Sequence, residues 1–306
     1  MKAILFSCVT LLAYLSTHAQ DPTVKQLKEA TEKKINKDAN DTIPALWKKG
    51  GLITLNLAQG SLTNWQGGGD KASFSAVAFS NLYAYYKNGK HAWDNTLDLG
   101  YGYVSTTSLG TRKSDDRIDL LSKYGYDLGK KFYLSTLLNF RTQFSEGYTY
   151  SKDGNGLDVK ELTSDFMAPA YILLSLGIDY KPTSYFSLFV SPLTQRWTIV
   201  NNDVLSARGA FGVTPGEKSY NELGSFLSAS FNKEIATNVS YKSRLDLFSN
   251  YKRDPGNVDV FWTNVLTMKV NKFLNANIGL DLLYDDNAIG RVQLRQILGI
   301  GFSTKF

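Results

Sequence analysis

The feature that most constrains the fold of this chain is an alternation of apolar and polar residues, which recurs from about residue 52 to the C-terminus. Between Leu174 and Lys181, for example, Leu, Leu, Ile and Tyr alternate with Ser, Gly, Asp and Lys. Successive side chains of a β-strand point to opposite faces, so such a segment has one apolar and one polar environment. The pattern predicts an all-β protein.

The alternation and the turn residues between the segments predict about twelve antiparallel strands. Their expected ranges are 52–58, 71–86, 93–103, 117–128, 132–144, 172–181, 185–198, 223–232, 239–247, 258–270, 274–284 and 292–306. In 71–86 and 185–198 apolar residues occupy both faces, and 223–232 and 258–270 are also less regular. The sequence does not assign the two faces of these four strands.

The lengths of the connections indicate what kind of sheet this is. Short turns such as Lys87–Lys90 alternate with longer polar segments, among them Ser105–Asp116, Ser145–Pro169 and Val200–Asn221. Short periplasmic turns opposite longer extracellular loops are typical of outer-membrane barrels, and an even strand number places both termini with the short turns. We therefore expect one closed transmembrane β-barrel.

The aromatic content agrees with a membrane barrel. The chain has 18 Tyr, 17 Phe and 5 Trp, yet its mean hydropathy is slightly negative. A helical membrane protein needs long apolar spans, and no such stretch follows Leu15. Aromatic residues near the expected strand ends, including Trp93, Phe132 and Tyr180, are placed as interfacial girdles require.

The N-terminus predicts export. Residues 1–19 have an early Lys2, an apolar run from Ala3 to Leu15, and Thr17-His18-Ala19 before a cleavage site at Gln20; this is the anatomy of a signal peptide. Residues 20–49 are expected to form a periplasmic tail or short helix, and residues 50–306 the barrel. The one cysteine, Cys8, lies in the expected signal peptide, so neither disulfides nor thiolate metal sites are expected in the mature chain.

The C-terminus carries a second export feature. Phe302 and the terminal Phe306 fall on the apolar face of the last expected strand. Such an ending is similar to the signal that the barrel assembly machinery reads in outer-membrane proteins. We expect that machinery and outer-membrane lipid as partners.

Four motifs, in order along the chain, resemble a known family. They are Ser61–Trp65 followed by Gly67–Gly69, Ser191–Thr194, Ile199–Asn201, and Gly209–Val213 followed by Pro215-Gly216. From about Trp47 to Phe306 the chain is similar to bacteroidete outer-membrane barrels catalogued as a domain of unknown function, family 3078. The resemblance implies the location and architecture, and it implies no activity.

Other function classes find little support. The net charge of the mature chain, about +5, is dispersed, whereas a nucleic-acid groove gathers basic residues on one face. The one mature histidine, His91, follows a short turn, away from an evident nucleophile, so we expect no enzyme and no catalytic residues. Asp153, Asn155, Asp158 and Glu161 do not have EF-hand spacing, so no metal or other cofactor is expected.

The predicted lumen carries charges of both signs. Its expected lining on the regular strands is Asp98, Asp119, Lys123, Arg141, Asp179, Arg244, Asp246, Asp281 and Arg295. A twelve-stranded barrel is narrow, between side-chain-filled small barrels and open porins. Two hypotheses follow: a narrow channel for small solutes, or a plugged barrel whose loops Ser145–Pro169 and Val200–Asn221 bind a partner.

Overall fold

The computed structural model describes residues 46–62, 70–152, 154, 158–271, 273–285 and 290–305. The predicted signal peptide, the tail up to residue 45 and Phe306 lie outside the described residues. The first strand begins at Trp47, ahead of the predicted barrel boundary at residue 50.

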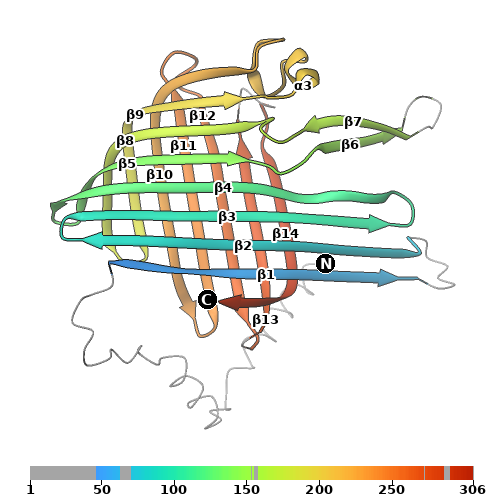
Figure 1. Cartoon of the computed structure of the whole chain (residues 1–306), viewed down its shortest axis with the longest axis horizontal. Helices are drawn as coiled ribbons and strands as arrows, with labels where there is room; N and C mark the ends of the chain where they lie inside the picture. Colours follow the sequence, from blue (N-terminus) through green and yellow to red (C-terminus); the bar gives the residue numbers. More distant parts are fainter. Residues whose placement is uncertain are drawn as a thin grey trace, which may run out of the picture. The chain divides into compact units, whose positions relative to one another are not determined.

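Twelve antiparallel strands form one closed barrel, which confirms the predicted fold class. In sheet order the barrel strands are β1 (Trp47–Ser61), β14 (Gln293–Lys305), β13 (Leu274–Tyr284), β12 (Val258–Lys269), β11 (Val239–Asn250), β10 (Ser219–Ala236), β9 (Phe186–Ile199), β8 (Ala170–Thr183), β5 (Phe132–Thr142), β4 (Gly110–Gly129), β3 (His91–Thr106) and β2 (Ala72–Asn88). Figure 1 shows β1 to β5, β8 and β9 in the near wall and β10 to β14 crossing behind them.

The closing seam joins the first and last strands. Leu55 is paired with Phe302, and Leu52 with Lys305. Since β1 also pairs with β2 along its whole length, no barrel strand leaves an open edge. Closure satisfies the backbone donors and acceptors that an edge strand would expose.

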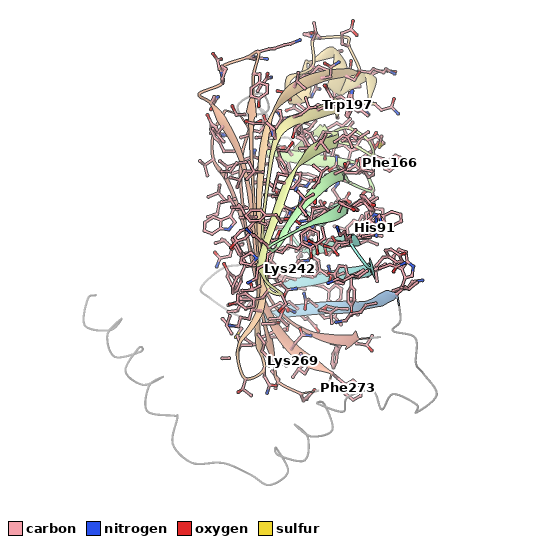
Figure 2. All side chains as sticks on the ribbon, turned by 90° about the vertical axis from the view of Figure 1, so that its left-hand side faces the viewer. His91, Phe166, Trp197, Lys242, Lys269 and Phe273 are labelled. Atoms are coloured by element: carbon pink, nitrogen blue, oxygen red, sulfur yellow. The ribbon has the colours of Figure 1, made fainter. Side chains whose placement is uncertain are left out.

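The two ends of the barrel differ as the sequence predicts. At the short-turn end, two residues join β2 to β3, β4 to β5, β8 to β9 and β10 to β11, while four join β12 to β13. Gly89, in the Asn88-Gly89 turn, has φ +53°, a conformation that favours glycine. Figure 2 shows Lys269 and Phe273 at this end and Lys242 farther along the wall.

The opposite end, the loop end, contains more regular structure than predicted. The expected loop Ser105–Asp116 is mostly strand, because β3 continues to Thr106 and β4 begins at Gly110. Strand pairing depends on backbone hydrogen bonds and continues where side chains are polar. The expected loop Ser145–Pro169 contains the hairpin β6 (Gly147–Lys152) and β7 (Asp158–Ser164), which forms its own two-stranded sheet.

The third loop-end segment, between β9 and β10, folds back on the preceding one. It contains helix α3 (Asp203–Ala207) and the 3-10 turn η1 (Ala210–Gly212). Val200, Leu205 and Val213 are buried with Ala168 in a small apolar cluster. Two of the motifs that resemble the known family, Ile199–Asn201 and Gly209–Val213, thus supply residues to this loop cluster.

Side chains divide into outward and inward sets that follow the pleat. On β5, Leu134, Thr136 and Leu138 are exposed, whereas Ser135, Leu137 and Asn139 are buried. The inward set also contains apolar residues: Leu137, Leu173, Phe189, Phe226 and Phe248 form a buried cluster. Because the interior is partly apolar, hydropathy does not separate the two faces of every strand.

The Ser191–Thr194 motif makes a bulge in β9. The pairing register with β8 shifts between Leu176 and Ile178, and the register with β10 shifts between Gly224 and Phe226. Ser191 Oγ lies 2.8 Å from the carbonyl oxygens of Leu176 and Leu193. Pro192, which has no N–H to donate, is tolerated here because the ladder is interrupted.

Two outward-facing hydrogen-bonded groups share one design. In the first, Trp93 Nε1 donates to Ser122 Oγ (2.8 Å), and Ser122 Oγ donates to Asn95 Oδ1 (2.7 Å). In the second, Trp262 Nε1 donates to Ser243 Oγ (3.0 Å), which lies 2.9 Å from Asn264 Oδ1.

In both of these Trp–Ser–Asn clasps, the Asn side chain also donates to a carbonyl oxygen of the next strand, Ala84 or Leu280. Each clasp thus connects three neighbouring strands by side-chain hydrogen bonds on the outer face. The polar groups of the clasps thus satisfy one another.

Candidate functional site

The most distinctive feature of the barrel interior is a group of two arginines and two aspartates from three strands. Arg141 (β5) lies 2.5 Å from Asp246 (β11) and 3.2 Å from Asp119 (β4). Arg244 (β11) lies 2.7 Å from Asp246 and 3.7 Å from Asp119. We call these four residues the arginine–aspartate cluster; its formal charges cancel.

The arginine–aspartate cluster crosses the barrel. Strands β8, β9 and β10 separate β5 from β11 on one side of the ring, so the Arg141–Asp246 pair joins strands that are not neighbours in the sheet. Side chains from such strands meet only across the interior. At this level the bore is therefore no wider than the reach of an arginine and an aspartate.

Further hydrogen bonds hold the cluster in place. Asn139 Nδ2 donates to Asp119 (2.6 Å), Arg244 donates to Asn139 Oδ1 (3.3 Å), and Ser228 Oγ donates to Asp246 (2.7 Å). The Arg141 guanidinium also lies over the Phe261 ring, 4.0 Å from its centroid. Buried charges require such pairing, because desolvation of an uncompensated charge costs several kcal/mol.

Two further interior groups contain four of the other predicted residues. Lys123 (β4) lies 2.7 Å from Asp179 (β8), and Lys181 lies 3.6 Å from the same carboxylate. On another part of the wall, Arg295 (β14) contacts Asp281 (β13) and lies 2.6 Å from Asp115 (β4).

Asp98 (β3) faces β11, which lies opposite it in the ring. Lys242 Nζ is 3.4 Å from Asp98, and Asn81 Nδ2 donates to the same carboxylate. The structure thus brings all nine predicted charged residues into ion pairs, in separate groups rather than in one row. That they line a path for solutes remains a prediction.

Sequence reasoning missed a fifth group, which surrounds Arg196. Its guanidinium lies 2.5 Å from Glu222, 2.7 Å from Asp259 and 3.8 Å from Asp285, and it stacks on the Phe248 ring at 4.3 Å. Arg196, Glu222 and Asp259 belong to β9, β10 and β12, whose faces the sequence did not assign. The sequence signal that could have assigned these residues to the inward face is the register of their strands against neighbouring strands with regular alternation.

A small interior cavity of about 120 Å³ lies between the arginine–aspartate cluster and the Arg196 group. Arg141, Asp246 and Arg196 contribute to its lining together with the aromatic side chains of Tyr171 and Phe261. It has room for a few water molecules or a small polar solute. The interior is therefore not completely filled between the arginine–aspartate cluster and the Arg196 group.

The remaining predicted positions lie outside this interior. Phe302 is 63% exposed on the outward face of β14; its role in assembly remains a prediction, as does that of Phe306. His91 is exposed at the start of β3, with Nδ1 within hydrogen-bond distance of the Tyr124 hydroxyl.

Of the four loop residues considered as metal ligands, the structure describes the side chain of one. Asp153, Asn155 and the Asp158 side chain lie outside the described residues, whereas Glu161 is 2.7 Å from Arg208. Among the residues that the structure describes, no group of three or more His, Cys, Asp or Glu could hold a metal ion. Within the same residues, no helix is long and apolar enough to cross a membrane.

Comparison with known families finds one match. A family model described as a protein of unknown function (DUF3078) matches residues 57–148. This confirms the resemblance to that family of unknown function over that stretch, which includes the Ser61–Trp65 motif but not the three later ones. The bacteroidete origin stays a prediction. No curated protein matches the chain.

Several solved structures are similar to this chain. An outer membrane channel from Pseudomonas putida F1 is 12% identical, with 88% of this chain and 99% of that chain covered and a TM-score of 0.38. The translocator domain of the autotransporter NalP from Neisseria meningitidis is 11% identical, with 99% of each chain covered and a TM-score of 0.35. The NanC porin is 9% identical, with 83% and 97% covered and a TM-score of 0.35. Because these TM-scores are low, the evidence for the barrel fold is the strand pairing of this chain itself.

Proposed function

We propose that this chain is an integral outer-membrane barrel that passes small solutes through a narrow, ion-paired lumen, without catalytic chemistry. The outward surface supports the membrane location. Large apolar side chains are exposed on strand after strand, for example Leu134 on β5, Leu176 on β8 and Leu294 on β14. A soluble monomer rarely exposes an apolar surface of this extent, whereas lipid requires it.

The arginine–aspartate cluster carries the proposal for the lumen. It spans the interior between non-adjacent strands, so a solute that passes must fit beside it or displace its ion pairs. The cluster has two positive and two negative side chains, so a passing ion of either sign meets both attractive and repulsive charges. We therefore expect a low conductance, limited at this level, rather than the open conductance of a large porin.

Planar-bilayer recording of the folded protein tests this proposal. The double variant Arg141→Ala/Asp246→Ala removes one cross-interior pair without changing the net charge and leaves the Arg244–Asp119 pair in place. We expect single-channel conductance to rise severalfold, because one of the two arginines that cross the bore is gone together with its carboxylate partner. Folding of each protein is checked by its resistance to unfolding in SDS without heating.

The control variant is Arg208→Ala/Glu161→Ala. It removes an ion pair of the same charge type that is exposed at the loop end. Its conductance should equal that of the native protein. If the native protein and the interior variant both fold and neither conducts above background, the channel proposal is wrong.

One observation favours the second hypothesis, a plugged barrel whose loops bind a partner. Segments 145–169 and 200–218 pack on each other: Asn201 N donates to Met167 O (2.9 Å), and Asn202 Nδ2 donates to Asp165 (3.0 Å). An ordered loop surface loses less conformational entropy on binding than a mobile one. A folded, non-conducting protein would leave this hypothesis in place.

A further inference from the structure

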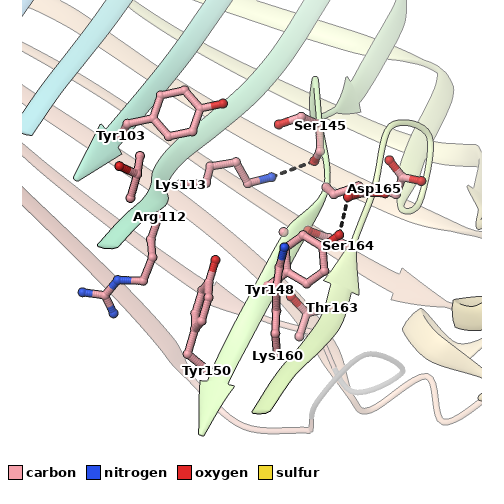
Figure 3. Close-up of a pocket in the computed structure, with 13 residues that line it drawn as sticks. Tyr103, Arg112, Lys113, Ser145, Tyr148, Tyr150, Lys160, Thr163, Ser164 and Asp165 are labelled. Atoms are coloured by element: carbon pink, nitrogen blue, oxygen red, sulfur yellow. Dashed lines mark hydrogen bonds between the residues drawn. The ribbon is translucent and has the colours of Figure 1, made fainter. Parts of the chain in front are cut away.

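A second cavity lies at the loop end, between the first residues of β4 and the β6–β7 hairpin. Its volume is about 650 Å³, within the range of small-molecule sites. Its lining includes the cations Arg112, Lys113 and Lys160 and the rings of Tyr103, Tyr148 and Tyr150. Figure 3 shows Arg112 and Lys113 on one side and Tyr148, Tyr150 and Lys160 on the hairpin opposite.

Among the residues that the structure describes, two of the three cations in this rim cavity contact aromatic rings rather than carboxylates. Lys160 Nζ lies 3.5 Å from the centroid of the Tyr148 ring, and the Arg112 guanidinium lies 5.7 Å from that of Tyr150. Lys113 differs, because it is 2.7 Å from both Asp116 Oδ2 and Ser145 O. Arg112 and Lys160 are therefore the cations available to an anion.

An unsatisfied hydrogen-bond donor also indicates an anion site. Arg112 Nε is buried and has no hydrogen-bond partner among the described residues. A buried N–H without an acceptor is costly, and in native proteins it usually marks a missing partner such as water, an ion or a ligand. An anionic ligand in the rim cavity would supply that acceptor.

The rest of the lining is suited to a ligand with hydroxyl groups. Glu146 and Asp165 offer carboxylate acceptors, and Thr111, Thr163 and Ser164 offer hydroxyls. The Tyr148 hydroxyl donates to Glu146, and this hydrogen bond raises the pKa of Tyr148. Tyr103 presents a ring that is 43% exposed.

We propose that the rim cavity binds a phosphorylated sugar. Arg112 and Lys160 take the phosphate, since charge-assisted hydrogen bonds from arginine suit phosphate oxygens. The carboxylates and hydroxyls bind sugar hydroxyl groups, and the tyrosines provide flat surfaces for the ring. Inorganic phosphate alone would leave most of the volume and the acceptors unused. The site is separate from the interior cavity and does not depend on solute passage.

Two sources could supply this chemistry: a soluble sugar phosphate, or the phosphorylated sugar headgroup of a glycolipid. Isothermal titration of the folded protein in detergent with glucose 1-phosphate, glucose and inorganic phosphate addresses the first. Hydrogen exchange of residues 147–164 addresses the second, with the protein in phosphatidylcholine nanodiscs that contain or lack lipopolysaccharide. Binding in either experiment identifies the source.

The variant Arg112→Gln/Lys160→Gln should weaken binding at least about tenfold in the experiment where native protein binds, or abolish the lipopolysaccharide-dependent protection. The control Lys252→Gln removes an exposed cation from a different loop and should leave both unchanged. SDS resistance before heating shows that each variant is folded.

Three results would overturn the proposal. One is no binding of glucose 1-phosphate together with no protection by lipopolysaccharide. The second is equal affinity for glucose 1-phosphate and inorganic phosphate, which would indicate an adventitious anion site. The third is unchanged binding by the folded Arg112→Gln/Lys160→Gln variant.

Discussion

At the scale of single residues, the barrel depends on polar groups that satisfy one another on both faces of the wall. Inside, each carboxylate of the arginine–aspartate cluster contacts both of its arginines. Outside, the Trp–Ser–Asn clasps remove polar atoms from the outward surface by bonding them together. Sequence alternation predicted the inward aspartates but not the clasps, since Asn and Ser on an apolar face break the pattern unless their partners are known.

The serine is the central residue of each clasp. Replacement of Ser243 by Ala removes the acceptor of Trp262 Nε1 and one of the two donors to Asn264 Oδ1, which keeps the Tyr241 hydroxyl. We therefore expect a loss of about 1–2 kcal/mol in the free energy of unfolding. Urea unfolding of the protein in lipid vesicles, followed by tryptophan fluorescence, measures this. Ser225→Ala on the outward face of β10 is the control and should change stability by less than about 0.5 kcal/mol. Equal stability of the two variants would show that the clasp contributes nothing.

At the scale of elements, the β9 bulge shows what a motif can and cannot reveal. Ser191–Thr194 predicted a family resemblance but no geometry. The structure shows that Pro192 lies where the ladder is interrupted, that Gly177 of β8 lies opposite the interruption, and that Gly224 of β10 borders it. The β6–β7 hairpin was missed for a different reason: its strands pair with each other, outside the barrel sheet, and carry no sustained apolar alternation.

Gly177 tests the bulge directly. A Cβ there would lie 2.1 Å from the carbonyl oxygen of Val190, whereas at Gly279, also an inward glycine, the nearest atom would be 3.8 Å away. Gly177→Ala should therefore cost about 1–3 kcal/mol or prevent folding, and Gly279→Ala should be nearly neutral. Refolding yield and urea midpoints of both variants check this. Native stability of Gly177→Ala would mean that the backbones of β8 and β9 are not in close contact there.

At the scale of the whole molecule, the sequence predicted the number of strands, their approximate positions and the contrast between the two ends. These features follow from local periodicity and turn residues, which a single sequence contains. It did not predict which charges meet. Arg141 and Asp246 are 105 residues apart, and their contact depends on the curvature and closure of the sheet. The mixed faces of β2 and β9 follow from the same closure, because a narrow barrel fills part of its interior with apolar side chains.

The central claim is that position in the pleat, rather than hydropathy, decides which side chains face lipid. Spin labels on single cysteines along β13 test it, using the accessibility of each label to oxygen, which partitions into lipid, and to a water-soluble nickel chelate. The sequence's one cysteine, Cys8, lies in the predicted signal peptide, so each introduced cysteine is unique in the mature chain. Leu282 and Leu283 are the decisive pair, since both are apolar and only Leu283 lines the interior cavity.

We predict oxygen-dominated relaxation at positions 278, 280 and 282, and low oxygen accessibility at 277, 279 and 283. Oxygen-dominated relaxation at both Leu282 and Leu283, or the same accessibility at all six positions in lipid vesicles, would contradict a closed barrel with an inward-facing and a lipid-facing surface.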